Sequence, residues 1–362
     1  MQALLLHEFH GRLGARFGEL NGREIVSDYG DLSAEYVALQ TSAAVLDLSF
    51  RSRLCLTGAD RQKFLNGQVT NNVKDLKTGE GCYAALITAK GKMQSDLNIY
   101  CLEGEILLDF EPGLTAAVAE RLEKYIIADD VQVVDVSPHY GLLSVQGPGA
   151  QEVVTRFLLG VSAPTQPMNF VPIKTEASGE IYLMNHARTG SCGVDVFVPV
   201  GQMEQTAEKL IAAARTIKGG PCGWEALEMA RIEAGIPRFG VDMDSSNLPP
   251  EAGIEGRAIS YTKGCYIGQE VIARIRTYGQ VAKALRGLRL SNVSNHLPKK
   301  GDKLFLGDKE VGYVTSAVMS PKMNSHIAFG YVRREANKIG TELKLKMEEG
   351  EASAVIVEIP FD

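Results

Sequence analysis

The region after Gln280 constrains the fold most, because the composition changes there to short β-prone runs broken by turns. Evenly spaced short strands with turn signals are typical of a small antiparallel barrel. The stretch Ser291 to Gly301 is expected to be a loop within it. We therefore predict a C-terminal barrel over residues 281–362. Its expected strands are Leu285 to Leu290, Leu304 to Leu306, Val311 to Val318, Ile327 to Val332, Leu343 to Met347 and Ala354 to Ile359.

Residues 1–280 alternate irregularly between helical and strand-like segments, without the regular rhythm of a doubly wound sheet. Leu97 to Leu108 is expected to form two strands around a turn, followed by a helix from Gly113 to Ile127. A second strand pair and helix are expected at Ile181 to Met184, Gly193 to Pro199 and Gln202 to Ala214. Because 362 residues exceed what one core usually holds, we predict an α+β fold whose first 280 residues divide into two subdomains near residues 140–165.

Composition and charge narrow the function classes. A net charge of -6 disfavours a general nucleic-acid binder, which needs a basic surface. The chain carries no apolar run long enough for a membrane helix and no signal peptide, so a cytoplasmic location without membrane contact is expected. Its 6 cysteines show no C-x-x-C spacing, so we predict reduced thiols and no resident metal site.

One cysteine stands in a segment that has the character of a site. The segment KGCYIGQE places a lone thiol between two glycines and next to a cationic residue, which favours the reactive thiolate. The alternative is a glycine turn that holds a small buried cysteine. The candidate residues of this motif are Lys263, Gly264, Cys265, Tyr266, Gly268, Gln269 and Glu270.

A cationic run surrounds this motif. Between Arg257 and Arg289 the only acid is Glu270. Such a run is either a solvated face or an anion site for a polyglutamylated tail, an acidic partner or RNA. The bases of the run are Arg257, Lys263, Arg274, Arg276, Lys283, Arg286 and Arg289.

Seven stretches, taken in order, resemble the YgfZ-type branch of folate-binding proteins in the glycine cleavage T-protein (aminomethyltransferase) superfamily. The resemblance implies ferredoxin-like folate-binding units around a central cavity, a C-terminal barrel and tetrahydrofolate or a derivative as ligand. The matching stretches are Ala44 to Ser49, Thr57 to Asp60, Phe64 to Asn71, Val145 to Pro148, Gly223 to Met243, Asn247 to Ala252 and Lys263 to Glu270.

The resemblance also implies where folate binds. Gly91 to Tyr100 is similar to the family segment whose acid contacts the cofactor and acts in aminomethyl transfer, and that acid falls on Asp96. Tyr83 and Tyr100 are then candidate walls of the pterin slot. Without the resemblance, Asp96 would be interpreted as a turn or cap residue before a strand.

A second acid is implied by the stretch Arg188 to Asp195, which is similar to a family segment ending in the acid that pairs with the pterin's donor edge. Asp195 has that position, since a carboxylate can accept two parallel hydrogen bonds from an aminopyrimidine. Two family residues are replaced here by Arg188 and Ser191. A family arginine is replaced by Leu227, whereas Arg231 is retained as a candidate cofactor contact or a helix-face ion pair.

Three functions compete on this evidence. The YgfZ-type resemblance implies a tetrahydrofolate-binding accessory protein that supports assembly or repair of [4Fe–4S] proteins, including tRNA-modifying enzymes. Cys265 would ligate or exchange with a partner, and iron–sulfur assembly or client proteins would be partners. The alternative is a tetrahydrofolate-dependent aminomethyltransferase in which Asp96 is catalytic. Direct RNA binding by a tRNA modification enzyme is the least favoured, and whether the chain is an enzyme stays open at this point.

Overall fold

The computed structural model describes residues 1–157, 161–175, 179–291, 296–348 and 350–361. The chain divides into two compact units, each built from two pieces of sequence. Unit 1 contains Met1–Ala84 and Ser95–Ala230, and unit 2 contains Ala85–Gln94 and Arg231–Asp362. In the described ranges, no helix combines the length and the apolar character needed to cross a membrane.

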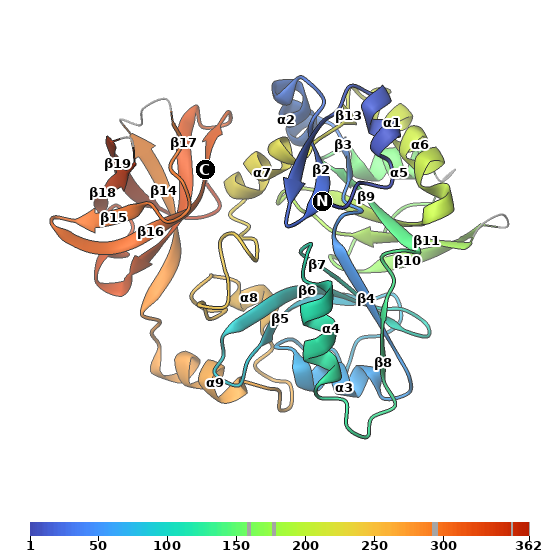
Figure 1. Cartoon of the computed structure of the whole chain (residues 1–362), viewed down its shortest axis with the longest axis horizontal. Coiled ribbons are helices and arrows are strands. Elements are labelled where there is room, and N and C mark those ends of the chain that lie inside the picture. The colour runs from blue at the N-terminus through green and yellow to red at the C-terminus, as the bar shows by residue number, and fades with distance from the viewer. Residues whose placement is uncertain (158–160, 176–178, 292–295, 349, 362) are drawn as a thin grey trace. The chain divides into compact units, whose positions relative to one another are not determined.

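The first large sheet has five strands in the order β5-β6-β7-β4-β8 (Figure 1). Helix α4 packs on β4 and β8, and its buried face carries Val118 and Leu122. The strands are β4 (Ser52–Thr57), β5 (Gly81–Ile87), β6 (Met93–Cys101), β7 (Ile106–Phe110) and β8 (Gln132–Asp135), and the helices beside them are α3 (Arg61–Gln68) and α4 (Thr115–Glu123).

The second sheet has six strands in the order β10-β11-β12-β9-β3-β13. Helices α5 and α6 pack on β9 and β12, where valines at alternate positions of β12 enter one apolar core. The strands are β3 (Ala44–Asp47), β9 (Tyr140–Gln146), β10 (Phe170–Thr175), β11 (Gly179–Asn185), β12 (Gly193–Pro199) and β13 (Gly220–Pro221), and the helices are α5 (Ala150–Phe157) and α6 (Met203–Arg215).

The remaining elements of unit 1 are a 3-10 turn, the start of helix α7 and the N-terminal elements. The 3-10 turn η1 (Val200–Gln202) leads into α6, and α7 (Trp224–Glu233) continues from unit 1 into unit 2. The N-terminal elements are α1 (His7–Arg12), the hairpin β1 (Arg16–Leu20) with β2 (Arg23–Asp28), and α2 (Leu32–Thr41), which begins at an Asp31 side-chain cap.

Both predicted strand-pair and helix blocks are present. The first block consists of β6, β7 and α4, and the second of β11, β12 and α6. The predicted helix from Gly113 to Ile127 is shorter in the structure, because Gly113 has a φ of 81° and the helix starts only at Thr115. The predicted α+β class is thereby confirmed as a mixed α/β fold that ends in a barrel.

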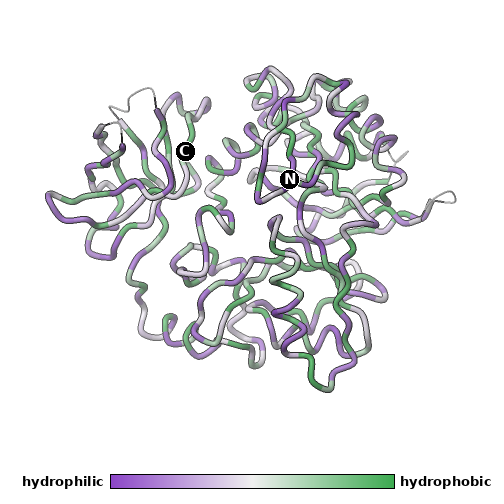
Figure 2. Tube along the Cα trace, viewed as in Figure 1, coloured by the Kyte–Doolittle hydropathy of each residue, from purple (hydrophilic) through white to green (hydrophobic). Residues whose placement is uncertain are grey.

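Six strands near the C-terminus close into an antiparallel barrel in the order β14-β17-β16-β15-β18-β19. Five of the six predicted runs lie within these strands, and the sixth, Ala354 to Ile359, extends past the end of β19 at Val357. Figure 2 shows apolar stretches interrupted by polar ones along the strands. Of the predicted loop, residues 292–295 lie outside the described residues, and residues 296–301 contain no helix or strand. The strands are β14 (Lys283–Ser291), β15 (Lys303–Leu306), β16 (Lys309–Ser320), β17 (Ser325–Arg333), β18 (Glu342–Met347) and β19 (Gly350–Val357), with the 3-10 turn η2 (Arg334–Ala336) after β17.

A buried carboxylate ties the stretch that precedes the barrel in unit 2 to the barrel itself. Asp242 is fully buried and accepts from the hydroxyls of Thr315 (2.7 Å) and Ser316 (2.6 Å) on β16. It also pairs with the Arg231 guanidinium and accepts from the backbone N–H of Arg238 at 3.1 Å. Burial would raise the pKa of Asp242, but the Arg231 charge and these hydrogen bonds hold that pKa below its ordinary value.

Unit 2 also includes the tip of the β5–β6 hairpin. The backbone N–H of Met93 donates to Asn247 O at 3.0 Å, and Lys92 Nζ donates to Ser246 O at 2.6 Å. At Gly91, where φ is 74°, a Cβ would lie 2.9 Å from a methyl carbon of Val271 on α9 (Gln269–Tyr278). The tip is therefore packed closely against the segment that precedes the barrel, which also holds α8 (Glu255–Ala258).

The Asp242→Ala substitution should lower the free energy of unfolding by about 3–5 kcal/mol, because it removes the counter-charge of a buried arginine. The midpoint of urea unfolding measures this. The matched control is Glu351→Ala, which breaks the exposed Lys344–Glu351 pair and should change stability by about 0.5 kcal/mol or less. Equal effects of the two substitutions would contradict the assigned role of Asp242.

Candidate active site

Two acids of unit 1 stand at the centre of a buried polar network, one on each large sheet. On β12, Asp195 lies opposite Ser144 of β9, and on β7, Asp109 lies opposite Asn98 of β6. Residues directly opposite each other in antiparallel strands have neighbouring side chains. Both pairs are hydrogen-bonded, at 2.7 Å from Ser144 Oγ to Asp195 Oδ1 and 2.9 Å from Asn98 Nδ2 to Asp109 Oδ2.

Asp195 is completely enclosed by donors. Arg188 Nε lies 3.1 Å from both carboxylate oxygens, and Arg188 Nη2 lies 2.6 Å from Oδ2. His186 Nδ1 is 3.0 Å from the same Oδ2. The carboxylate has no exposed surface. Burial would raise the pKa of Asp195, but the Arg188 charge and then His186 outweigh it, so the pKa lies well below its ordinary value.

Asp109 is held by two arginines. Arg51 Nε donates to Oδ1 at 2.9 Å and Arg188 Nη2 donates to Oδ2 at 3.1 Å, while Arg51 Nη1 also reaches Glu111 Oε1 at 2.6 Å. Burial would raise the pKa of Asp109, but the charges of Arg51 and Arg188 keep it below its ordinary value. Asp109 is therefore ionised at neutral pH despite having no exposed surface.

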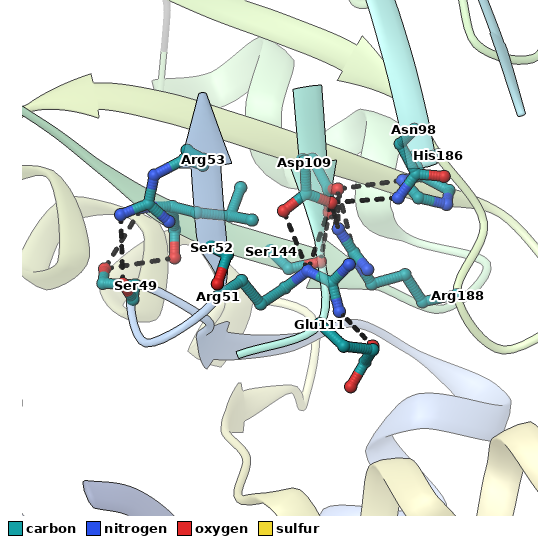
Figure 3. A network of polar contacts seen from close by, with 12 residues as sticks. Ser49, Arg51, Ser52, Arg53, Asn98, Asp109, Glu111, Ser144, His186 and Arg188 are labelled. Carbon is teal, nitrogen blue, oxygen red and sulfur yellow. Dashed lines mark hydrogen bonds and ion pairs between the residues drawn. The ribbon is translucent and has the colours of Figure 1, made fainter. Parts of the chain in front are cut away.

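Arg188 joins the two sheets through this network (Figure 3). Its one guanidinium donates both to Asp195 on β12 and to Asp109 on β7. The planar fork of arginine suits such two-sided contacts, which the single ammonium of lysine would not make. The Arg188 backbone is held separately, because its N–H donates to Gln146 Oε1 at 2.8 Å.

A third arginine lies close to the network. Arg53 lies opposite Asp109 in the β4–β7 pairing, and its Nη2 donates to the Ser49 carbonyl at 3.0 Å (Figure 3). Within the part of the chain that the structure describes, its Nε and Nη1 have no hydrogen-bond partner. Burial lowers the pKa of Arg53 to about 10, so it stays charged at neutral pH. The three arginines here therefore balance the charges of Asp109, Glu111 and Asp195.

His186 and Tyr100 form the neutral side of the site. The Tyr100 hydroxyl oxygen lies 3.3 Å from His186 Nδ1, and the Tyr100 ring has no exposed surface. Its edges and faces meet Phe170 and Phe197, with ring centroids 6.1 and 6.3 Å away. Burial and then the Arg188 charge lower the pKa of His186, so its imidazole is neutral at pH 7. Tyr100 is therefore a core residue that supports His186.

Another pair lies farther along β6. The Tyr83 hydroxyl on β5 donates to Asp96 Oδ2 at 2.9 Å, and both residues are half-buried. Asp96, Asn98 and Tyr100 alternate along β6 and so share one face of the strand. Because a strand rises about 3.3 Å per residue, Asp96 lies about 7 Å along the strand from Asn98. One face of β6 thus runs from the Tyr83–Asp96 pair to the Asp109 network.

The KGCYIGQE motif belongs to unit 2, whereas Tyr83, Asp96, Tyr100 and Asp195 belong to unit 1. Cys265 is exposed, and Lys263 Nζ lies 5.0 Å from the centre of the Tyr266 ring. The remaining residues of the motif start α9. Gly268 is the N-cap of α9 with a φ of 83°, and a Cβ at this position would lie 2.4 Å from Thr88 O. Gln269 is the first residue of the helix, and Glu270 pairs with Arg274 one turn later. Gly264 has open space around its Cα.

Arg231 and Leu227, the two residues of helix α7 that the family resemblance singled out, are both buried. Arg231 pairs with Asp242, which lies outside helix α7, and donates to Ile236 O at 3.2 Å. Leu227 lies in an apolar core cluster of unit 1. Among the described residues, no group of three or more His, Cys, Asp or Glu side chains is arranged to hold a metal ion.

Sequence reasoning missed most of the network. It named Asp195 and noted Arg188 as a replacement, but it did not identify Arg51, Asp109 or Glu111. A signal existed for Asp109, because it is the one charged residue in the otherwise apolar strand Ile106–Phe110. Charged residues are rarely fully buried unless they are paired. Its arginine partners Arg51 and Arg188 lie 58 and 79 positions away, a separation that no local pattern reveals.

The arrangement can hold a polar, planar ligand. A carboxylate held in one plane by Ser144 and His186 is suited to accept two parallel N–H groups, and the half-buried Asp96 can accept or orient a nitrogen. The Tyr83 hydroxyl donates to Asp96 Oδ2 and so orients this carboxylate. Hydrogen bonds from such pre-oriented groups give orientation and specificity.

Comparison with known proteins agrees with this fold. The GCVT N-terminal domain pattern matches residues 6–263, and the Glycine cleavage T-protein C-terminal barrel domain pattern matches residues 283–362. The chain belongs to the glycine cleavage T-protein family. A solved glycine cleavage system aminomethyltransferase T from Bartonella henselae has the same fold, with a TM-score of 0.90 at 23% identity, covering 100% of this chain and 98% of the other.

Curated relatives match over nearly their whole length. An aminomethyltransferase of Geobacillus kaustophilus is 30% identical over 363 residues, which cover 98% of this chain and 97% of the relative. One of Thermosynechococcus vestitus is 29% identical over 355 residues, covering 96% and 92%. These names overturn the prediction of an accessory protein for iron–sulfur assembly, which is therefore wrong. The resemblance to the YgfZ-type branch gains no support from them and stays a prediction.

The stabilisation from Asp195 should depend on pH in a defined direction. Its folded pKa lies below its ordinary value of about 3.9, so the stabilisation is present above that value and is lost as the pH falls through it toward the folded pKa. The difference in unfolding free energy between the wild type and Asp195→Asn should thus be largest near neutral pH and shrink toward about pH 3.

Urea unfolding midpoints at successive pH values measure this difference. As a control, Glu348→Gln removes one partner of the exposed Lys299–Glu348 pair and should leave the midpoint nearly unchanged at neutral pH. A difference between wild type and Asp195→Asn that grows as the pH falls would contradict the ionised, paired state of Asp195.

Proposed function

We propose that this protein is a tetrahydrofolate-dependent aminomethyltransferase. The observation that carries the proposal is the match to curated aminomethyltransferases over more than 90% of both chains, including one at 30% identity. Tetrahydrofolate, when bound, supplies the nitrogens that receive the one-carbon unit. We further propose that residues 1–280 carry the ligand site and residues 281–362 form a separate barrel, a division supported by the family matches at 6–263 and 283–362.

The residues present fit a pterin in part. Asp195 has the planar acceptor pair that an aminopyrimidine edge requires, and Ser144 and His186 hold that plane. Both oxygens also accept from Arg188, so a ligand has to share or replace those contacts. Tyr100 is enclosed by Phe170 and Phe197, and we assign it a supporting role through His186.

Asp96 is the residue we assign to the reaction. It is half-buried, lies on the same strand face as Asn98, and its Oδ2 accepts from the Tyr83 hydroxyl. That hydrogen bond orients the carboxylate. An ionised carboxylate beside the reacting nitrogens can hold a proton on one of them and stabilise the positive charge that develops during transfer.

Arg231 and the cysteine motif receive different roles. Arg231 is engaged by Asp242 and Ile236, so we assign it a positioning role within its own unit. The proposed transfer has no step that requires a thiol from the protein. Cys265 is exposed, and its neighbour Lys263 extends over the Tyr266 ring.

The proposed function is tested by calorimetric titration with tetrahydrofolate, together with a glycine-cleavage assay that supplies the aminomethylated carrier protein. Binding with turnover is the expected result. Binding without turnover would reject the transferase assignment but retain the folate site, and the absence of both would reject the proposal.

The Asp96→Asn variant should lose about 100-fold or more in kcat with a smaller change in tetrahydrofolate affinity, because the amide keeps the shape of the side chain but not its charge. Tyr83→Phe removes the hydroxyl that donates to Asp96 and should have a smaller effect on kcat. Unfolding midpoints of both variants control for stability. A kcat of Asp96→Asn equal to that of the wild type would remove Asp96 from the reaction.

The Cys265→Ser variant should transfer aminomethyl groups at close to the wild-type rate, since the substitution changes one exposed atom outside unit 1. Steady-state assays of freshly reduced protein measure this. A large loss of kcat would instead restore the sequence-based prediction that Cys265 is catalytic.

A further inference from the structure

The Arg188 guanidinium occupies both oxygens of Asp195 through one edge. Nε lies 3.1 Å from Oδ1 and Oδ2, and Nη2 lies 2.6 Å from Oδ2. This edge carries two parallel N–H donors on nitrogens that share one carbon. A 2-amino-4-oxopyrimidine ring, which is the recognition edge of a pterin, presents the same pair of donors from a ring N–H and an exocyclic amino group. The side chain thus has the donor pattern of the ligand that the acid would bind.

We propose that Arg188 is a specificity-determining residue that competes with the ligand, from within the chain, for Asp195. The proposal rests on the proposed function, in which Asp195 anchors the pterin. A ligand binds to Asp195 only when the guanidinium withdraws, so only a ligand with two such donors replaces what is lost. The ligand class is therefore an aminopyrimidine with this N–C–N donor edge.

Asp109 makes the withdrawal possible. Arg188 Nη2 already lies 3.1 Å from Asp109 Oδ2, and this second acceptor belongs to β7 on the other sheet. When the guanidinium leaves Asp195, it still has a counter-charge. A buried arginine without one would be strongly destabilised, so an exchange without Asp109 would be prohibitive. Asp109 stays bound by Arg51 and Asn98 throughout.

The acid stays in position during the exchange. Ser144 Oγ and His186 Nδ1 hold the Asp195 carboxylate at 2.7 and 3.0 Å independently of Arg188. The Arg188 backbone also stays, because its N–H is fixed on Gln146 Oε1 at 2.8 Å. Only the Arg188 side chain has to rotate, and a pre-oriented acceptor then meets the ligand.

The apparent affinity for tetrahydrofolate is the intrinsic affinity multiplied by the fraction of molecules in which Arg188 has left Asp195. Charge-assisted hydrogen bonds are strong enough that removing this competitor should tighten tetrahydrofolate binding roughly 10- to 100-fold. The test is calorimetric titration of full-length wild type and Arg188→Ala. The matched control is Arg16→Ala, which removes an arginine from another buried carboxylate of unit 1, Asp28, and should leave the affinity unchanged.

Two small probes test the same contact without folate. Guanidinium ion at low millimolar concentration and 2-aminopyrimidin-4-one should each raise the unfolding temperature of Arg188→Ala but not that of the wild type or Arg16→Ala. If both probes bind Arg188→Ala while no variant binds tetrahydrofolate, the proposed function fails and the competition stands. If tetrahydrofolate binds the wild type and Arg188→Ala equally, or if the folded Arg188→Ala binds neither probe, the competition is overturned.

If Arg188→Ala does not fold, the Arg188→Lys variant provides the test. Lysine keeps the positive charge but offers a single point donor in place of the fork, so it competes less well for the two oxygens. Tetrahydrofolate should bind it more tightly than the wild type. Equal or weaker binding would overturn the proposal.

Discussion

The guanidinium of Arg188 is the contact on which the arrangement of unit 1 depends. It donates to Asp195 on one sheet and to Asp109 on the other, in a region without exposed carboxylate surface. Charges at such sites are tolerated only when each has a partner, so the positions of three arginines and three acids are mutually dependent. This requirement fixes the register of Ser144 against Asp195 and of Asn98 against Asp109, because a one-residue slip would turn these side chains to the opposite faces.

The pairing of the buried charges also connects the stability of unit 1 with the proposed ligand site. Strand β6 carries Asp96, Asn98 and Tyr100 on one face: Asp96 is the residue proposed for the reaction, Asn98 donates to Asp109, and the Tyr100 hydroxyl lies beside His186 Nδ1. A substitution on this face therefore acts on neighbouring functions at once. Ser144 and His186 already hold the Asp195 carboxylate in the folded protein, so the proposed exchange moves only the Arg188 side chain.

Local patterns in the sequence predicted the elements well and the site incompletely. All six barrel strands were found, because alternation and turn residues are local properties. Asp96 and Asp195 were named through family resemblance, and their roles stay predictions. Arg51, Asp109 and Glu111 were not found, because their pairing joins residues 58 or more positions apart. The conspicuous Cys265 motif led to an incorrect function, and in the structure its Gly268 has a local role as the left-handed N-cap of α9.

Unit 2 is assembled from two pieces of chain, Ala85–Gln94 and Arg231–Asp362. During synthesis the first piece leaves the ribosome long before its packing partners Asn247, Leu248 and Val271 exist. The contacts of the β5–β6 hairpin tip can therefore form only after most of unit 1 has been synthesised. The β5–β6 tip, in the first third of the chain, can therefore pack only after the last third has been translated. In a shortened chain that lacks these partners, the tip would be exposed to proteases.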